Sequence, residues 1–183
     1  MSTIVRTRRL ELRPAGVAEL EAELAGGKAL ERRLGVAVPA GWPPELYDEA
    51  ATRWTLDMVR KAGGETSWSM YYIVDPEVAT AIGVCGFKGP PDIEGTVEIG
   101  YSVMPEYRRR GYATEAAGGL VLRAFAEPSV TRVVAETLTD LTPSIGVLEK
   151  LGFRFAGAGE EPGVVRYEFT RADLANADLA FGA

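Results

Sequence analysis

The chain has 183 residues, 46% of them hydrophobic and 25% charged, with a formal net charge of -6, one cysteine (Cys85) and no histidine. This length and composition support one hydrophobic core, so we expect a single domain over residues 1–183. The lone cysteine and the lack of histidine exclude disulfide frameworks, CxxC metal sites, zinc hydrolase motifs and Ser-His or Cys-His catalytic pairs, and we expect no metal. The negative charge argues against broad nucleic-acid binding, although it allows a local basic patch. No apolar run approaches the roughly 20 residues that span a bilayer.

The N-terminal residues predict a strand. Residues 7–14 (TRRLELRP) place Leu10 and Leu12 on one face and charged side chains on the other, and Pro14 ends the pattern. This segment lacks the uninterrupted apolar run of about 7 to 15 residues that a secretory signal needs. We therefore expect a cytoplasmic protein that binds neither membrane nor nucleic acid.

Two helical regions follow the first strand. Residues 17–34 are rich in helix formers but interrupted at Gly26 and Gly27, which predicts two short helices or one broken helix. Residues 45–62 predict a further helix, because apolar side chains recur at every fourth position. These apolar positions are Leu46, Ala50, Trp54 and Met58.

Three strand-like runs come next, at residues 67–75, 79–89 and 95–105. Asp-Pro and Gly-Pro-Pro-Asp turns separate them, which predicts an antiparallel meander. After the third run the hydrophobic period changes, and residues 112–126 predict an amphipathic helix.

The C-terminal third returns to strands. Residues 131–138 predict a buried strand and residues 143–151 a short helix, with Thr142 as its N-cap and Gly152 as its C-terminal stop. Two closing strands are expected at residues 153–158 and 164–170. The order of elements predicts a mixed α/β sheet of the α+β type, in which one helix crosses between neighbouring strands.

The segment YSVMPEYRRRGYATEA, residues 101–116, joins a strand to a helix through the basic loop RRRG at residues 108–111. A helix N-terminus presents free N–H groups and a partial positive charge, and glycine lets a diphosphate approach the backbone closely. The loop lacks the Gly-Lys-Ser/Thr ending of a Walker loop and the GxGxxG pattern of dinucleotide sites. A different phosphate-bearing ligand is therefore expected.

With this loop, the sequence resembles the GNAT superfamily of N-acetyltransferases, whose signature Gln/Arg-x-x-Gly-x-Gly/Ala is matched by Arg108, Gly111 and Ala113. A second family block is matched, apart from Gly146, by PSIGVLEKLGF at residues 143–153. The opening TRRLELRP is similar to that of the subgroup that includes ribosomal-protein alanine N-acetyltransferases. The resemblance implies the GNAT (acyl-CoA N-acyltransferase) fold, a central and mostly antiparallel sheet of about six to seven strands flanked by helices.

The resemblance also implies a site for acetyl-CoA. In the family the loop holds the pyrophosphate, which implicates Arg108, Arg109, Arg110, Gly111, Tyr112, Ala113 and Thr114. The preceding strand splays from its neighbour and pairs with the pantetheine arm, which implicates Tyr101, Ser102 and Val103. Ser144, in the second block, is expected at the same site.

Glu98 occupies the region where relatives place a carboxylate base, and we predict that it takes the proton of the acceptor ammonium, directly or through a water. The alternative is that Glu98 faces water while Val97 and Ile99 face the core. Two positions depart from the family. Leu141 stands where many members have asparagine, and Leu148 where many have a tyrosine that protonates the leaving thiolate. The thiolate is then expected to take its proton from water.

The implied reaction is N-acetylation of a primary amine, on a protein N-terminus or a small molecule, by direct attack in a ternary complex. An acidic protein suits a cationic acceptor such as a peptide N-terminus, a polyamine or an aminoglycoside. Trp42, in a Gly-Pro loop, and Tyr72 are the candidates for acceptor binding, although strands also favour tyrosine for packing alone. The alternative function is a non-catalytic acyl-CoA-binding sensor or regulatory module. We expect a monomer or a homodimer.

Overall fold

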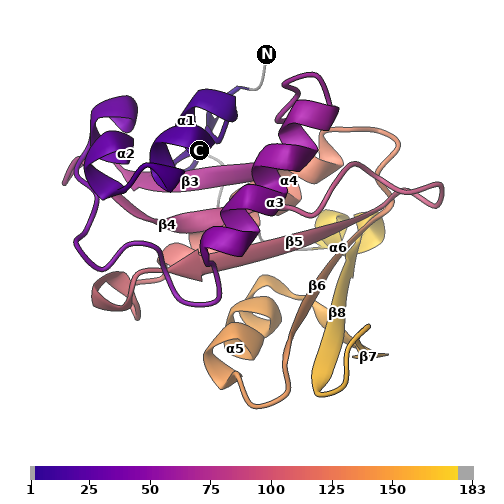
Figure 1. Ribbon diagram of the computed structural model, residues 1–183. Helices are drawn as coiled ribbons and strands as arrows, with labels where there is room; N and C mark the ends of the chain where they lie inside the picture. The colour runs from indigo at the N-terminus through magenta and orange to yellow at the C-terminus, as the bar shows by residue number, and fades with distance from the viewer. Residues whose placement is uncertain (1–2, 177–183) are drawn as a thin grey trace.

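The computed structural model describes residues 3–176, which form one mixed sheet in the order β1-β2-β3-β4-β5-β6-β8-β7 (Figure 1). The strands are β1 (Val5–Arg6), β2 (Glu11–Pro14), β3 (Met70–Asp75), β4 (Thr80–Phe87), β5 (Thr96–Val103), β6 (Arg132–Leu138), β7 (Arg154–Ala158) and β8 (Val164–Thr170). Neighbouring strands are antiparallel except β5 and β6, which are parallel. The mostly antiparallel sheet is confirmed. Its eight strands exceed the expected number because the two-residue β1 folds back on β2.

The helices cover both faces of this sheet. They are α1 (Val17–Leu24), α2 (Gly27–Leu34), α3 (Glu49–Lys61), α4 (Tyr112–Phe125), α5 (Thr142–Leu151) and α6 (Arg171–Asn176). Figure 1 shows α1, α2 and α3 in front of the sheet, with α4 behind it. Helix α4 joins the parallel strands β5 and β6, so the predicted crossover, meander and closing strand pair are confirmed. Within residues 3–176, no helix is both long and apolar enough to cross a membrane.

Strand β3 is buried on both faces and separates two hydrophobic cores. Tyr71 and Ile73 belong to the core on the α4 side, together with Leu120 of α4. Tyr72 and Val74 belong to the core on the side of α1, α2 and α3. Successive side chains of a strand point to opposite faces, so one strand supplies both cores.

Helix α3 begins at Glu49, later than predicted. Asp48 caps it, because Oδ1 of Asp48 accepts a hydrogen bond from the N–H of Ala51 at 2.9 Å. Leu46 has a φ of 63°, which is outside the right-handed helical region, so Leu46 belongs to the preceding loop.

The predicted apolar stripe of α3 does not face the sheet, and Trp54 in that stripe is 54% exposed. The buried side chains of α3 are instead Thr52, Thr55, Leu56 and Val59. Threonine is tolerated there because the hydroxyls of Thr52 and Thr55 donate to the carbonyl four residues earlier, at 3.2 and 2.9 Å. The prediction was wrong because it counted only apolar residues as buried.

Helix α5 begins one residue earlier than predicted, with Leu141 as the N-cap and Thr142 as the first helical residue. The chain turns before this point, since the N–H of Thr142 donates to the carbonyl of Asp140 at 2.9 Å. The Thr142 side chain therefore makes no capping hydrogen bond. Gly152 ends the helix with a φ of 92°, as predicted, because glycine adopts the left-handed conformation without steric cost.

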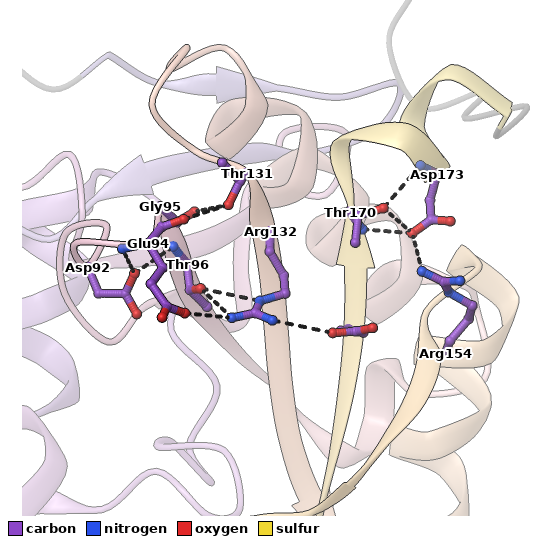
Figure 2. Close-up of polar contacts among 10 residues, drawn as sticks. Asp92, Glu94, Gly95, Thr96, Thr131, Arg132, Arg154, Thr170 and Asp173 are labelled. Atoms are coloured by element: carbon purple, nitrogen blue, oxygen red, sulfur yellow. Dashed lines mark hydrogen bonds and ion pairs between the residues drawn. The ribbon is translucent and has the colours of Figure 1, made fainter.

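Polar contacts fasten β5 to β6 at the end where both strands begin (Figure 2). Oγ1 of Thr131 donates to the carbonyl of Glu94 at 2.7 Å, and Nη2 of Arg132 donates to Oγ1 of Thr96 at 3.0 Å. Asp92 stiffens the turn before β5, because its Oδ1 accepts from the N–H groups of Glu94 and Thr96, both at 2.9 Å. The parallel pair is held together at this end, so any separation of the two strands occurs at the other.

Asp173 fastens α6 to the last two strands (Figure 2). Its Oδ2 accepts from the N–H and the hydroxyl of Thr170 at 2.8 and 2.7 Å, and it forms an ion pair with Arg154 at 3.1 Å. One carboxylate therefore joins β7, β8 and α6.

Candidate active site

Strands β5 and β6 separate after Ile99. Their pairing runs from Thr96 opposite Arg132 to Ile99 opposite Ala135. From residue 100 to residue 103, β5 continues beside β4 alone, and β6 continues beside β8 alone. The β6-facing backbone edge of residues 100–103 thus has no strand partner among residues 3–176. The structure places Tyr101, Ser102 and Val103 on this edge.

Tyr101 and Ser144 meet across the gap between β5 and α5. The Tyr101 hydroxyl donates to the carbonyl of Ser144 at 3.1 Å and lies 3.2 Å from its Oγ. Burial raises the pKa of Tyr101 to about 12, against the opposing effect of the Ser144 hydrogen bond. The phenol therefore keeps its proton at neutral pH, and this proton is the one donated to the Ser144 carbonyl. Leu148 is fully buried in the core on the α4 side.

The loop between β5 and α4 presents a run of main-chain N–H groups. A short 3-10 helix, Pro105–Tyr107, follows β5, and the loop then reaches Gly111, the N-cap of α4, at φ 78° and ψ 6°. Arg109 also has a positive φ, of 60°. Within the described residues, no carbonyl accepts a hydrogen bond from the N–H groups of residues 109–114. Tyr112, Ala113 and Thr114 form the first turn of α4, so these donors point from a helix N-terminus.

The three loop arginines do not act alike. Arg108 turns back, donating from Nε to the carbonyl of Val103 at 3.1 Å and from Nη2 to the carboxylate of Glu45 at 2.8 Å. Arg110 donates to the carbonyl of Glu106 at 3.1 Å. Arg108 therefore braces the end of β5 against the segment before α3, and phosphate binding by its side chain remains a prediction.

Arg9, which was not predicted as a site residue, lies against the start of α4. Its guanidinium carbon is 4.6 Å from the centroid of the Tyr112 ring, and its Nη2 lies 3.4 Å from where a Cβ on Gly111 would sit. The Tyr112 hydroxyl donates to Oδ2 of Asp75 at 2.8 Å. The signal that could have identified Arg9 was its place in TRRLELRP, from which a strand and a subgroup resemblance were predicted but no site residue.

Glu98 lies on the face of β5 opposite the α4-side core, to which Val97 and Ile99 belong. Its side chain is only 18% exposed, and its carboxylate forms an ion pair with Lys88 of the loop after β4. Glu98 is thus largely covered and does not simply face water. It shares its face of β5 with Gly100 and Ser102.

A pocket of about 440 Å³ opens on this face, between α3 and the strands β3, β4 and β5. Its sheet side comprises Met70, residues 84–88 and residues 100–102, and its helix side comprises Leu46, Tyr47, Ala51, Trp54 and Thr55. Cys85 in the lining is buried, which raises the pKa of its thiol, so the thiol stays protonated and unreactive. No cluster of three or more His, Cys, Asp or Glu side chains within residues 3–176 is arranged to hold a metal ion.

Trp42 and Tyr72 meet at a buried carboxylate beside this pocket. Nε1 of Trp42 donates to Oε1 of Glu23 at 2.6 Å, and the Tyr72 hydroxyl donates to Oε2 at 2.8 Å. Burial raises the pKa of Glu23, although these two hydrogen bonds oppose the shift. Trp42 and Tyr72 do not belong to the lining of the 440 Å³ pocket, and their contact with an acceptor remains a prediction.

Comparisons with known proteins identify the family of this chain. The model of the acetyltransferase (GNAT) domain family matches residues 9–154. The uncharacterized N-acetyltransferase YjdG of Bacillus subtilis (strain 168) is 31% identical over 150 residues, which cover 82% of this chain and 89% of YjdG.

Solved structures share the fold at lower identity. The ribosomal-protein-S5-alanine acetyltransferase of Vibrio fischeri superposes with a TM-score of 0.68 at 17% identity, covering 94% of this chain and 98% of that one. RimL, a ribosomal L7/L12 alpha-N-protein acetyltransferase in complex with coenzyme A, superposes with a TM-score of 0.65 at 20% identity. The match covers 93% of this chain and 99% of the RimL chain. The family match, the relative and the fold agree, and this chain belongs to the GNAT family of acetyltransferases and is an acyltransferase.

Proposed function

We propose that this chain transfers the acetyl group of acetyl-CoA to a primary amine by direct attack within a ternary complex. The observation that carries the proposal is the continuity between the unpaired edge of β5 at residues 100–103 and the free N–H groups of residues 109–114. The edge offers main-chain donors and acceptors to an extended amide-containing arm, and the helix N-terminus offers donors to a diphosphate. The β5 edge and the N-terminus of α4 lie one after the other, in the same order as the pantetheine arm and the diphosphate of acetyl-CoA.

The side chains around this path fit acetyl-CoA, the acetyl donor of the family. The guanidinium groups of Arg109 and Arg110 are exposed beside the N–H groups and add positive charge for the phosphates. The hydroxyls of Tyr101 and Ser144 lie at the gap, where they would hydrogen-bond the pantetheine amides.

The transfer step needs a neutral amine and a polarised carbonyl. We assign Glu98 as the base that takes a proton from the acceptor ammonium, because its carboxylate lies on the pocket side of β5 and is largely covered. The amine nitrogen then bonds to the acetyl carbon and loses its second proton to water, the carbon–sulfur bond breaks, and the thiolate leaves. Leu148 is buried and has no acidic proton to give to the thiolate, so the thiolate takes its proton from water.

Initial-rate kinetics with both substrates varied tests the proposal. Direct attack predicts double-reciprocal lines that intersect, and mass spectrometry of the enzyme with acetyl-CoA alone should show no acetylated protein. Parallel lines together with a covalent acetyl-enzyme would contradict the ternary complex and point to a two-step transfer.

A further inference from the structure

Resting on the proposed function, we propose that the acceptor is a primary amine carried on a single apolar group, and that this group fills the pocket beneath α3. The polyamine and aminoglycoside alternatives, which the acidic composition allowed, are then excluded as preferred acceptors. Four features of the pocket carry the inference.

The first feature is the charge of the lining. Among the residues that line the pocket within the described part of the chain, none is aspartate or glutamate. A polyamine or an aminoglycoside carries several ammonium groups, and each one loses its hydration on entering a pocket without a carboxylate partner. An amine with one ammonium group and an apolar body avoids this cost, because only the ammonium needs a partner.

The second feature is apolar surface that the rest of the fold leaves uncovered. Leu46 is 79% exposed and Trp54 is 54% exposed, and both line the pocket. Large apolar side chains left in water at a pocket mouth indicate a surface for an apolar ligand.

The third feature is a loop in which one residue, Leu46, is held in a strained backbone conformation. Leu46 adopts a φ of 63°, which is rare for a residue with a bulky side chain. The preceding residue, Glu45, is fixed by two groups of the proposed acetyl-CoA site: its carbonyl accepts from the Ser102 hydroxyl at 2.5 Å, and its carboxylate pairs with Arg108 at 2.8 Å. Strain of this kind persists where the surrounding contacts impose it, which is common at ligand sites. The contacts here hold Leu46 at the pocket wall.

The fourth feature is the difference between two glycines of the lining. A Cβ on Gly86 would lie 2.5 Å from the carbonyl of Ser69 and 2.7 Å from Cα of Met70, so packing requires glycine there. A Cβ on Gly100 would meet nothing within 4 Å. The absence of a side chain at Gly100 therefore leaves open space on the pocket side of β5, beside the unpaired edge.

These features orient the acceptor. Lys88 lines one end of the pocket, and its ion-pair partner Glu98 lies next to the lining on the same face of β5, where the acceptor ammonium meets the Glu98 carboxylate. The apolar body then extends over Gly100 towards Trp54. A volume of about 440 Å³ matches one aromatic or aliphatic group, carried by a small amine or by the first residue of a peptide.

The test compares kcat/KM for phenethylamine, phenylalanine amide, spermidine and kanamycin in the wild type and in two single variants. Trp54→Ala should lower kcat/KM for the two apolar amines by about tenfold or more, mainly through KM, because the aromatic wall of the pocket is lost. Ile93→Ala is the matched control, since Ile93 is fully exposed outside the pocket, and it should leave these values unchanged. Phenethylamine and phenylalanine amide distinguish a free amine from a peptide terminus.

The two proposals fail in different ways. Preference of the wild type for spermidine or kanamycin would overturn the apolar acceptor while leaving the acetyltransferase reaction standing. Equal effects of Trp54→Ala and Ile93→Ala on the apolar amines would overturn the pocket assignment. Tight binding of acetyl-CoA without acetylation of any amine would overturn the proposed function itself, and the inference with it.

Discussion

The carboxylate of Glu115, in the first turn of α4, accepts a hydrogen bond from the N–H of Arg9 at 2.6 Å and forms an ion pair with Nε of the same residue at 2.7 Å. The hydroxyl of Thr7 adds a third hydrogen bond to Glu115 at 2.7 Å. One buried side chain thus ties the segment before β2 to the turn whose N–H groups we propose bind diphosphate. Glu115 therefore links the N-terminal segment to the proposed acetyl-CoA site.

Replacing Glu115 tests this link through its pH dependence. Burial alone would raise the pKa of Glu115, but the hydrogen bonds from Thr7 and Arg9, with the charge of Arg9, lower it. A lowered pKa means that Glu115 stabilises the fold above its usual pKa of about 4.3 and loses this effect as pH falls. We expect Glu115→Gln to reduce the free energy of unfolding by about 2 kcal/mol at pH 7, and by less as the pH falls below about 4. Urea unfolding at several pH values measures this, and a constant difference would contradict it.

The contribution of Glu23 to stability should change with pH in the opposite direction to that of Glu115. Burial raises the pKa of Glu23, so its native form binds a proton more tightly than its unfolded form. The stabilisation it provides is then complete below its usual pKa and declines as pH rises through the raised value. The free energy of unfolding of the wild type minus that of Glu23→Gln should therefore be larger at pH 5 than at pH 8 in the same urea experiment. A wild-type advantage that grows with pH would refute this assignment.

Substitutions at Gly111 and Gly35 distinguish the effect of backbone strain from an effect on ligand binding. Gly111 and Gly35 both adopt a left-handed conformation, at φ 78° and 69°, and an added Cβ meets little at either position. Alanine at each should cost roughly 1 kcal/mol of stability. Only Gly111→Ala should weaken acetyl-CoA binding in a calorimetric titration, by about tenfold, because only Gly111 lies in the loop that we propose binds the phosphates. Similar affinities for both variants would remove the loop from the site.

Glu98→Gln should lower kcat by about a hundredfold, the usual contribution of a general base. The deficit should be greatest at low pH, where most of the acceptor amine is protonated and removal of its proton limits the rate. Glu94→Gln is the control, because Glu94 is an exposed carboxylate at the fastened end of β5. A pH–rate profile identical in shape to that of the wild type would exclude Glu98 from proton transfer.

Much of the fold follows from local patterns in the sequence. The meander, the crossover helix and Gly152 as a helix stop were predicted because alternation, period and glycine act within a few residues. The buried face of α3 was missed because buried threonines satisfy their hydroxyls with main-chain carbonyls, which no hydrophobic count records. The contacts of Arg108 and Arg9 were missed for another reason. Their partners, Glu45 and Glu115, are 63 and 106 residues away and become neighbours only in the folded chain.

The central claim, acetyl transfer to an amine, is tested most directly by measuring coenzyme A thiol and acetylated product together when enzyme, acetyl-CoA and phenethylamine are mixed. Thiol and N-acetylphenethylamine should appear in equal amounts, and the formation of both should depend on enzyme and amine. Acetyl-CoA binding without either product, over the full panel of amines, would contradict it and would favour a protein that binds the coenzyme without turning it over.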